Sequence, residues 1–238
     1  MAVNWRLLVT CEHGGNRVPP AYRDLFPSGG GVLSSHRGWD PGALVLARAL
    51  ARGLNAPLVY AATSRLLVDL NRSPTHPDLF SPYTRGLSPA RRQEILQDYY
   101  LPYRREVENF IRLQNRQGRA VLHLSAHSFT ARLGGKTRRA DLGLLYDPRR
   151  TREREFCRAL KHAIETRLPG LSVRRNYPYR GTADGLTTWL RRRFGGNRYL
   201  GVEVELNQRI AGAEPAAWRG LRAGLCRAVG EAVAEINL

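Results

Sequence analysis

VLHLSAHSF, residues 121–129, is an apolar run that leads into a polar loop. Such a run predicts a buried central strand of an α/β sheet. Ligands of open α/β sheets bind at the carboxyl ends of the strands, so His127 stands at a position typical of a site residue. A lone histidine there is more often a core residue with one satisfied ring nitrogen. The functional interpretation therefore depends on the residues at the ends of the other strands.

Two further predicted strands are followed by polar residues. Residues 6–11 form a short apolar strand, and His13 comes two residues after it. Residues 64–70 predict another strand, which leads into Asn71 and Arg72. A guanidinium group at such a position would bind a substrate carboxylate through two parallel hydrogen bonds.

Two carboxylates lie at comparable positions. Asp40 precedes a proline at the start of a predicted helix over 43–53, where an aspartate either caps the helix or presents a metal-binding carboxylate. Glu203 and Glu205 share one face of a predicted strand over 200–207, because side chains alternate along a strand. A buried glutamate there is either paired with an arginine or functional. Glu205 is nearer the carboxyl end and is the better catalytic candidate.

The predicted strands alternate with helices, and the sequence has no internal repeat. This order favours a three-layer α/β/α sandwich on a mostly parallel or mixed central sheet, in one domain over 1–238. Strands are predicted at 6–11, 56–62, 64–70, 121–129, 141–146, 171–174 and 200–207. Helices are predicted at 43–53, 90–117 (kinked or split at Pro102), 151–167, 186–193 and 215–236, with a mobile or specificity loop at 130–139.

Composition indicates the class of protein. The 238 residues are 42% hydrophobic, which is enough for a sizeable core. No apolar run approaches the ~20 residues needed to span a bilayer, and the first strand begins too early to leave room for a signal peptide. Three scattered cysteines without CxxC spacing indicate a reducing compartment. We therefore expect a cytoplasmic protein without a membrane partner.

The net charge of +18 suggests an anionic partner. Only Lys136 and Lys161 are lysines, so 36 of the 38 basic residues are arginines. They are spread along the chain without the patterns of common nucleic-acid-binding modules. Biased base composition of the coding DNA also produces such a spread, so we do not expect nucleic acid to be the primary partner. The same charge suits attraction of small acidic substrates.

Six motifs give the chain a resemblance to the N-formylglutamate amidohydrolase family. They recur in the family's order across nearly the whole chain. The motifs are CEHGGNRVP (11–19), WDPGA (39–43), SRLLVDLNR (64–72), AHSF (126–129), NYPYRG (176–181) and VELN (204–207). That family is in turn similar in arrangement to the zinc carboxypeptidases. The resemblance therefore implies a phosphorylase/hydrolase-like, zinc carboxypeptidase-like fold.

The resemblance also implies roles for individual residues. His13 and His127 would bind one Zn²⁺ ion, Glu205 would act as the general base, and Arg72 would hold a substrate carboxylate. The residues expected around the substrate are Asn71, Arg72, Tyr179 and Arg180, with Arg138 as a further candidate.

The third metal ligand departs from the carboxypeptidase pattern. That pattern has a glutamate three residues after the first histidine, and here the position is Asn16. We expect Asp40 to supply the third ligand, with Glu12 and Asn16 as the alternatives.

The reaction implied by the resemblance is metal-dependent hydrolysis of the N-formyl or N-acyl amide of an acidic amino acid such as N-formylglutamate. One alternative is a carboxypeptidase-like or other N-acyl amino acid hydrolase acting on a different substrate. Another is a basic nucleic-acid-binding protein on a hydrolase scaffold. A third is a cysteine hydrolase that uses Cys11 beside His13, although the sequence shows no third group to orient them.

Overall fold

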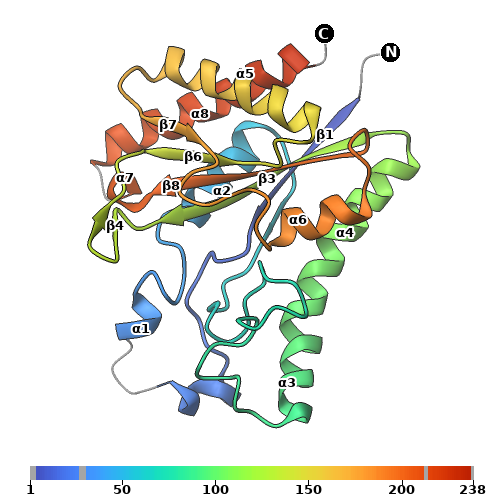
Figure 1. The fold of residues 1–238 in the computed structure, drawn as a ribbon, viewed down its shortest axis with the longest axis vertical. Coiled ribbons are helices and arrows are strands. Elements are labelled where there is room, and N and C mark those ends of the chain that lie inside the picture. Colours follow the sequence, from blue (N-terminus) through green and yellow to red (C-terminus); the bar gives the residue numbers. More distant parts are fainter. Residues whose placement is uncertain (1–3, 27–30, 212–213, 237–238) are drawn as a thin grey trace.

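The computed structural model describes residues 4–26, 31–211 and 214–236. Its centre is a six-stranded sheet, most of whose strands are labelled in Figure 1. The strands are β1 (Trp5–Cys11), β2 (Leu58–Tyr60), β3 (Ala120–Phe129), β6 (Leu142–Leu145), β7 (Val173–Arg175) and β8 (Tyr199–Asn207). Their order across the sheet is β2-β1-β3-β8-β6-β7. All neighbours are parallel except β6 and β8, which are antiparallel, so the predicted mostly parallel or mixed sheet is confirmed.

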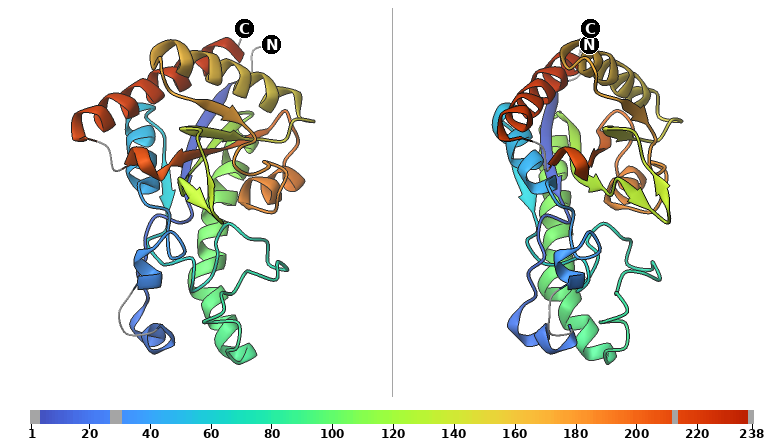
Figure 2. Two further views of the ribbon diagram at one scale, coloured as in Figure 1. Left: turned by 60° about the vertical axis from the view of Figure 1, so that its left-hand side comes forward. Right: turned by 90° about the vertical axis from the view of Figure 1, so that its left-hand side faces the viewer.

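Helices cover both faces of this sheet (Figure 2). One face is covered by α2 (Ala43–Gly53), α5 (Thr151–Arg167) and α8 (Pro215–Ile236), which share a core cluster with the sheet. The other face is covered by α4 (Leu101–Arg116) and α6 (Leu186–Arg193), which form a second cluster. The predicted three-layer α/β/α sandwich is therefore confirmed. No helix in the described part of the chain is long and apolar enough to cross a membrane.

The remaining elements are short and lie mainly between the strands and the long helices. They are η1 (Pro20–Leu25), α1 (Gly31–Ser34), α3 (Pro89–Ile95), the π-helical η2 (Leu96–Tyr100), β4 (Arg132–Leu133), β5 (Lys136–Thr137) and α7 (Gln208–Ala211). The predicted loop over 130–139 contains the hairpin of β4 and β5, whose two central glycines have positive φ.

The two faces of β3 differ in chemistry. Leu122, Leu124 and Ala126 belong to the core cluster that β3 shares with α2 and α8. Because side chains alternate along a strand, His123, Ser125 and His127 lie on the opposite face, which α4 covers, and all three are buried. The strand is buried on both sides as predicted, but one of its faces is polar. This polar row leads towards the edge of the sheet where the strands end.

The predicted strand over 64–70 is wrong. Its apolar side chains are buried, but the backbone forms turns, as when the N–H of Leu67 donates to the carbonyl of Ser64. The carbonyl of Leu67 is taken by the hydroxyl of Thr84 rather than by a neighbouring strand. The side chains pack under the long loop before α3, in the cluster that includes α4. An apolar run cannot by itself distinguish a buried strand from a buried loop of this kind.

The long helix predicted over 90–117 is divided as its proline suggests. Ser88 caps α3, accepting a hydrogen bond from the N–H of Arg91. The chain then widens into the π-helical turn η2, in which the N–H of Leu101 donates to the carbonyl of Leu96. Pro102 therefore stands in the first turn of α4, where a missing N–H is tolerated.

Candidate active site

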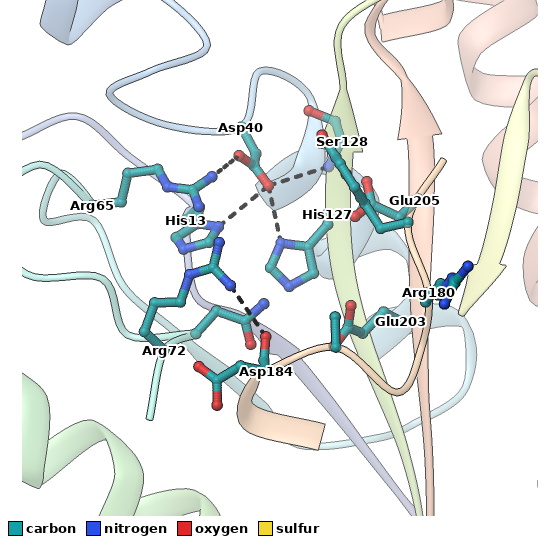
Figure 3. Close-up of a pocket in the computed structure, with 13 residues that line it drawn as sticks. His13, Asp40, Arg65, Arg72, His127, Ser128, Arg180, Asp184, Glu203 and Glu205 are labelled. Carbon is teal, nitrogen blue, oxygen red and sulfur yellow. Dashed lines mark hydrogen bonds and ion pairs between the residues drawn. The ribbon is translucent and has the colours of Figure 1, made fainter. Parts of the chain in front are cut away.

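Three buried side chains, those of His13, Asp40 and His127, meet at the carboxyl-terminal edge of the sheet (Figure 3). His13 follows β1 and His127 lies near the end of the parallel strand β3. Oδ2 of Asp40 is 3.0 Å from Nδ1 of His127 and 3.5 Å from Nδ1 of His13. One donor atom from each residue lies within 4.8 Å of the others. The structure thus brings together the three residues predicted as metal ligands.

The carboxylate of Asp40 does not cap α2. The N-cap position is Gly42, which has positive φ, and no side chain of the described residues caps the helix there. The Asp40 carboxylate instead faces the two imidazoles and accepts a hydrogen bond from the N–H of Ser128 at 3.3 Å. The capping role considered from the sequence is therefore wrong, and this carboxylate belongs to the site.

The outer nitrogen of each imidazole faces a second carboxylate. Nε2 of His13 lies 2.7 Å from Oδ1 of Asp69, and Nε2 of His127 lies 2.9 Å from Oε2 of Glu12. Arg65 joins the cluster through contacts of 2.8 Å with Asp69 and 3.3 Å with Asp40. Carboxylates in this position orient metal-binding histidines and leave the inner nitrogen for the metal.

Negative charge predominates in this cluster, because it contains three carboxylates, those of Glu12, Asp40 and Asp69, and one guanidinium group, that of Arg65. Burial alone would raise the pKa of Asp40, but the two imidazoles and Arg65 outweigh it and hold this pKa well below its usual range. Burial alone would lower the pKa of His127, but Asp40 and Glu12 outweigh it and raise this pKa well above the ordinary value. The cluster therefore stabilises an additional positive charge, carried by a proton or by a metal ion.

The donor set fits a metal ion. Two imidazole nitrogens and one carboxylate oxygen are donors typical of catalytic zinc sites. Nδ1 of His13 is buried and has no hydrogen-bond partner among the described residues. An ion beside it would satisfy a polar atom that the protein itself leaves without a partner. His13, Asp40 and His127 could therefore hold a metal ion.

The alternatives to this ligand set are placed less favourably. Glu12 faces Nε2 of His127 and Asp40 faces Nδ1, so the two carboxylates lie on opposite sides of the ring. Asn16 is not among the described residues that line the cavity beside the cluster. Cys11 is fully buried, and burial raises the pKa of its thiol well above the ordinary value, which disfavours the nucleophilic thiolate.

Glu205 faces the cluster from β8, where it is the register partner of His127 on β3. Burial, together with the negative charges of Asp40 and Glu203, raises the pKa of Glu205 to about 8 against the opposing effect of His127. Its Oε2 is buried and has no hydrogen-bond partner in the described part of the chain. Glu205 is thus a carboxyl group that is positioned beside the cluster and is not engaged elsewhere, as a general base requires.

A cavity of about 260 Å³ lies beside the cluster. All four residues expected around the substrate line it, namely Asn71, Arg72, Tyr179 and Arg180. The guanidinium group of Arg72 donates to the backbone carbonyl of Asp184 at 3.3 Å and has no carboxylate partner among the described residues. Arg138 does not line the cavity but donates to the hydroxyl of Tyr179 at 3.2 Å. Arg72 therefore remains available to an anionic ligand.

The turn that carries Tyr179 and Arg180 is anchored on β6 through Asn176. The Oδ1 atom of Asn176 accepts hydrogen bonds from the N–H groups of Tyr146, at 3.1 Å, and Gly181, at 3.0 Å. One amide side chain thus holds both ends of the turn. Both pocket residues of the turn line the cavity, and Arg180 lies on the opposite side of it from Arg72 (Figure 3).

Four charged residues of the site were not assigned from the sequence. Arg65 and Asp69 lie inside the run interpreted as a strand. The sequence feature that could have identified them is a pair of charged residues, four positions apart, in an otherwise apolar stretch. Asp184 and Glu203 also line the cavity. Asp184 follows the NYPYRG motif, and Glu203 was recognised only as the less favoured member of the glutamate pair.

Comparisons with known proteins identify the family and support the fold. A family model described as N-formylglutamate amidohydrolase matches residues 5–211. A gene product of Agrobacterium tumefaciens of known crystal structure is 32% identical, with a TM-score of 0.84, covering 98% of this chain and 92% of that one. The crystal structure of N-formylglutamate amidohydrolase from Ralstonia eutropha JMP134 shares the fold, with 22% identity and a TM-score of 0.64 over 98% of this chain and 94% of that one. No curated protein matches the chain. The chain therefore belongs to the N-formylglutamate amidohydrolase family.

Proposed function

We propose that the protein is a zinc-dependent amidohydrolase that removes the formyl group, or another N-acyl group, from an acidic amino acid such as N-formylglutamate. The observation that carries the proposal is a single cavity that joins the His13/Asp40/His127 cluster, Glu205 and the guanidinium group of Arg72, which has no carboxylate partner among the described residues. Membership of the family supports amide hydrolysis. The metal and the substrate are inferred from the chemistry of the cavity.

His13, Asp40 and His127 would hold the ion. When bound, zinc supplies Lewis-acid activation of water and of the amide carbonyl. Glu205 takes a proton from the attacking water as the new C–O bond forms. It then delivers that proton to the amine nitrogen as the C–N bond breaks, so the products are formate, or the corresponding acid, and the free amino acid.

Arg72 positions the substrate through its α-carboxylate, because a guanidinium group binds a carboxylate with two parallel hydrogen bonds. Asn71 assists: its Oδ1 is taken by the N–H of Leu186 at 2.7 Å, which leaves the amide nitrogen to donate to the ligand. Tyr179 and Arg180 also line the cavity, and Arg180 would bind a second carboxylate of the ligand. This division favours a dicarboxylic amino acid.

A second candidate is hydrolysis of a neutral N-acyl amino acid or a short peptide by the same residues. The observation in its favour is that Asp184 and Glu203 also line the cavity. Their negative charges would repel the side-chain carboxylate of a formylglutamate placed next to them. A substrate side chain that lies next to Arg180 favours a dicarboxylic amino acid. A side chain that lies next to Asp184 and Glu203 favours a neutral one.

The test is to measure the metal content of the purified protein and its hydrolysis of four substrates, with the metal removed and restored. The substrates are N-formylglutamate, N-acetylglutamate, an N-formyl neutral amino acid and a dipeptide. We expect zinc-dependent release of formate, fastest from N-formylglutamate. Faster turnover of the neutral compounds favours the second candidate, and hydrolysis that does not need a metal contradicts the proposal.

The matched pair of variants is His127→Ala and His162→Ala. His127 contacts the proposed metal site, and His162 is an exposed residue of α5 that does not line the cavity. We expect His127→Ala to lose zinc and activity while keeping its fold by circular dichroism, and His162→Ala to retain both. Full activity in His127→Ala would contradict the proposal.

A further inference from the structure

Glu12 is a buried carboxylate that takes no part in the reaction proposed above. It follows β1 directly and has no exposed surface. It is not among the described residues that line the cavity. A carboxylate in such a place costs folding free energy unless it is paired and hydrogen-bonded. Its partners therefore indicate what it does.

Three polar groups surround the Glu12 carboxylate. The hydroxyl of Tyr103, on α4, donates to Oε1 at 2.8 Å. The hydroxyl of Ser125, on β3, donates to Oε2 at 2.6 Å. The third group is Nε2 of His127, at 2.9 Å from Oε2. Two hydroxyl groups from different elements thus fix the carboxylate in place, and it faces one nitrogen of a proposed metal ligand.

The polar contacts of His127 are divided between its two ring nitrogens. Oε2 of Glu12 lies 2.9 Å from Nε2 without the alignment of a hydrogen bond, whereas Nδ1 is hydrogen-bonded to Oδ2 of Asp40 at 3.0 Å. A neutral imidazole carries its proton on one nitrogen and a lone pair on the other. A carboxylate favours the proton on the nitrogen that it faces, so Glu12 and Asp40 compete for the proton of His127. If Asp40 binds the ion, Glu12 is the carboxylate that remains to accept this proton.

His123 provides an internal comparison on the same face of β3. Its two ring nitrogens face hydroxyl groups, those of Thr10 and Tyr199, each at 2.7 Å. Hydroxyl groups donate or accept equally well, so this environment does not select one tautomer. His127 has carboxylate partners and His123 has hydroxyl partners, so a buried histidine of this strand does not need a carboxylate beside it.

We propose that Glu12 is a positioning residue, which keeps the proton of His127 on Nε2 and so presents the lone pair of Nδ1 to the metal ion. The inference rests on the proposed function, because it assigns His127 Nδ1 as a ligand. It adds that the affinity for the metal depends on a carboxylate that touches neither the metal nor the substrate.

The test compares Glu12→Gln with Glu153→Gln. Glutamine keeps the shape of the side chain and removes its charge. Glu153 is an equally buried carboxylate that contacts Arg191 at 2.9 Å and does not line the cavity. Its variant therefore controls for the general effect of neutralising a buried acid. The readouts are zinc affinity, by competition with a chromophoric chelator, and the visible spectrum of the Co²⁺-substituted protein.

We expect Glu12→Gln to bind zinc about 10- to 100-fold more weakly than the wild type and to show an altered Co²⁺ spectrum. We expect Glu153→Gln to lower the melting temperature without changing either readout. Wild-type zinc affinity and an unchanged Co²⁺ spectrum in Glu12→Gln would overturn the inference. A similar loss of affinity in both variants would also overturn it, since the effect would then be general.

Ser125→Ala keeps the inference testable if Glu12→Gln does not fold. It removes one hydrogen bond to Glu12 and leaves the carboxylate in place. We expect a several-fold loss of zinc affinity, and an unchanged affinity would overturn the inference. The two proposals also fail differently. Zinc binding that depends on His127 but not on Glu12 contradicts only this inference, whereas a wild-type protein that binds no zinc contradicts the proposed function as well.

Discussion

Glu203 and Glu205 lie two residues apart on one face of β8, yet their surroundings differ. The hydroxyl of Thr187 donates to Oε1 of Glu203 at 2.7 Å. Glu205 lies beside His127 and its Oε2 has no partner among the described residues. A carboxylate that is free of hydrogen bonds and close to the cluster is better suited to carry a proton between water and leaving group.

The corresponding prediction concerns Glu205→Gln. An amide of the same shape cannot accept the proton, so we expect kcat to fall by about 10²- to 10⁴-fold, with zinc content unchanged because Glu205 is not in the proposed ligand set. Steady-state kinetics and metal analysis of the variant check this. A variant that keeps more than about a tenth of wild-type kcat would rule out Glu205 as the general base.

His123 predicts a loss of stability in acid. Burial, and to a lesser extent the charges of Arg191 and His127, lower its pKa to about 4 from 6.5, against the opposing effect of Glu12. Below pH 6.5 the unfolded chain binds a proton that the folded chain does not. The contribution to stability is therefore fully present above pH 6.5 and is lost as the pH falls towards 4, by about 3 kcal/mol at about 1.4 kcal/mol per pH unit.

The measurement is the free energy of unfolding by urea between pH 7 and pH 4, for the wild type and for His123→Gln. Buried carboxylates also make the protein sensitive to acid, so the difference between the two proteins isolates the histidine. We expect this difference to shrink as the pH falls. A difference that stays constant would show that His123 titrates alike in the folded and unfolded states.

The candidate site was predictable from the sequence only in part. His13, Arg72 and His127 were selected because they end or follow apolar runs, Asp40 because it precedes a proline at a helix start, and Glu205 because it lies near the end of a strand. The structure places all five around one cavity. Which carboxylate faces which imidazole was not predictable. Those contacts join residues 56 and 115 positions apart, such as His13 with Asp69 and Glu12 with His127, and local spacing carries no information about them.

At the scale of elements, β6 and the turn over 176–181 lie too close together for any side chain at Gly143. A Cβ atom built on Gly143 would lie 1.8 Å from the carbonyl oxygen of Tyr177 and 3.2 Å from Cβ of Glu205. Gly143 is also the register partner of Glu205 across the antiparallel pair of β6 and β8. A substitution here would therefore displace the turn that carries Tyr179 and Arg180.

We predict that Gly143→Ala destabilises the protein by about 1–3 kcal/mol, as other overpacked sites do, and raises KM through the displaced turn. The matched control is Gly220→Ala on α8, where an added Cβ meets nothing within 4 Å. That variant is expected to gain up to about 1 kcal/mol, because alanine favours helix more than glycine. Thermal unfolding of both variants measures these changes in stability. Equal stabilities of Gly143→Ala and Gly220→Ala would contradict the packing argument.

Elements with clear periodicity were predicted well. The helices over 151–167, 186–193 and 215–236 have the predicted bounds. They were predictable because their apolar residues recur at helical spacing: α5, for example, buries Phe156, Leu160 and Ile164 on one face. The run over 64–70 failed because its apolar residues cover a loop. In β3 the apolar run was recognised, but its polar alternate face was not, since small polar residues and histidines do not interrupt an apolar pattern enough to be noticed.

At the scale of the whole molecule, the net charge of +18 should accelerate the capture of anionic substrates. Salt shortens the range of this attraction, from roughly 30 Å at 0.01 M to about 3 Å at 1 M. We therefore predict that kcat/KM for N-formylglutamate falls several-fold as KCl rises over that range, while kcat changes little.

The control is an uncharged N-acyl amino acid amide, whose kcat/KM should be nearly independent of salt. A flat salt profile for N-formylglutamate would show that the arginines do not attract substrate. Tight, steeply salt-dependent binding of RNA or DNA by a protein without metal or hydrolase activity would instead favour the nucleic-acid-binding alternative.

The order of the sheet has a consequence for synthesis on the ribosome. β8 is the last strand in the chain, but it lies between β3 and β6 in the middle of the sheet. A nascent polypeptide that has not yet released residues 199–207 therefore carries two unpaired strand edges, which readily bind other chains. Glu205 arrives with this strand, so a nascent polypeptide without it has the imidazoles of the site but not its base, and activity begins only after residues 199–207 have left the ribosome.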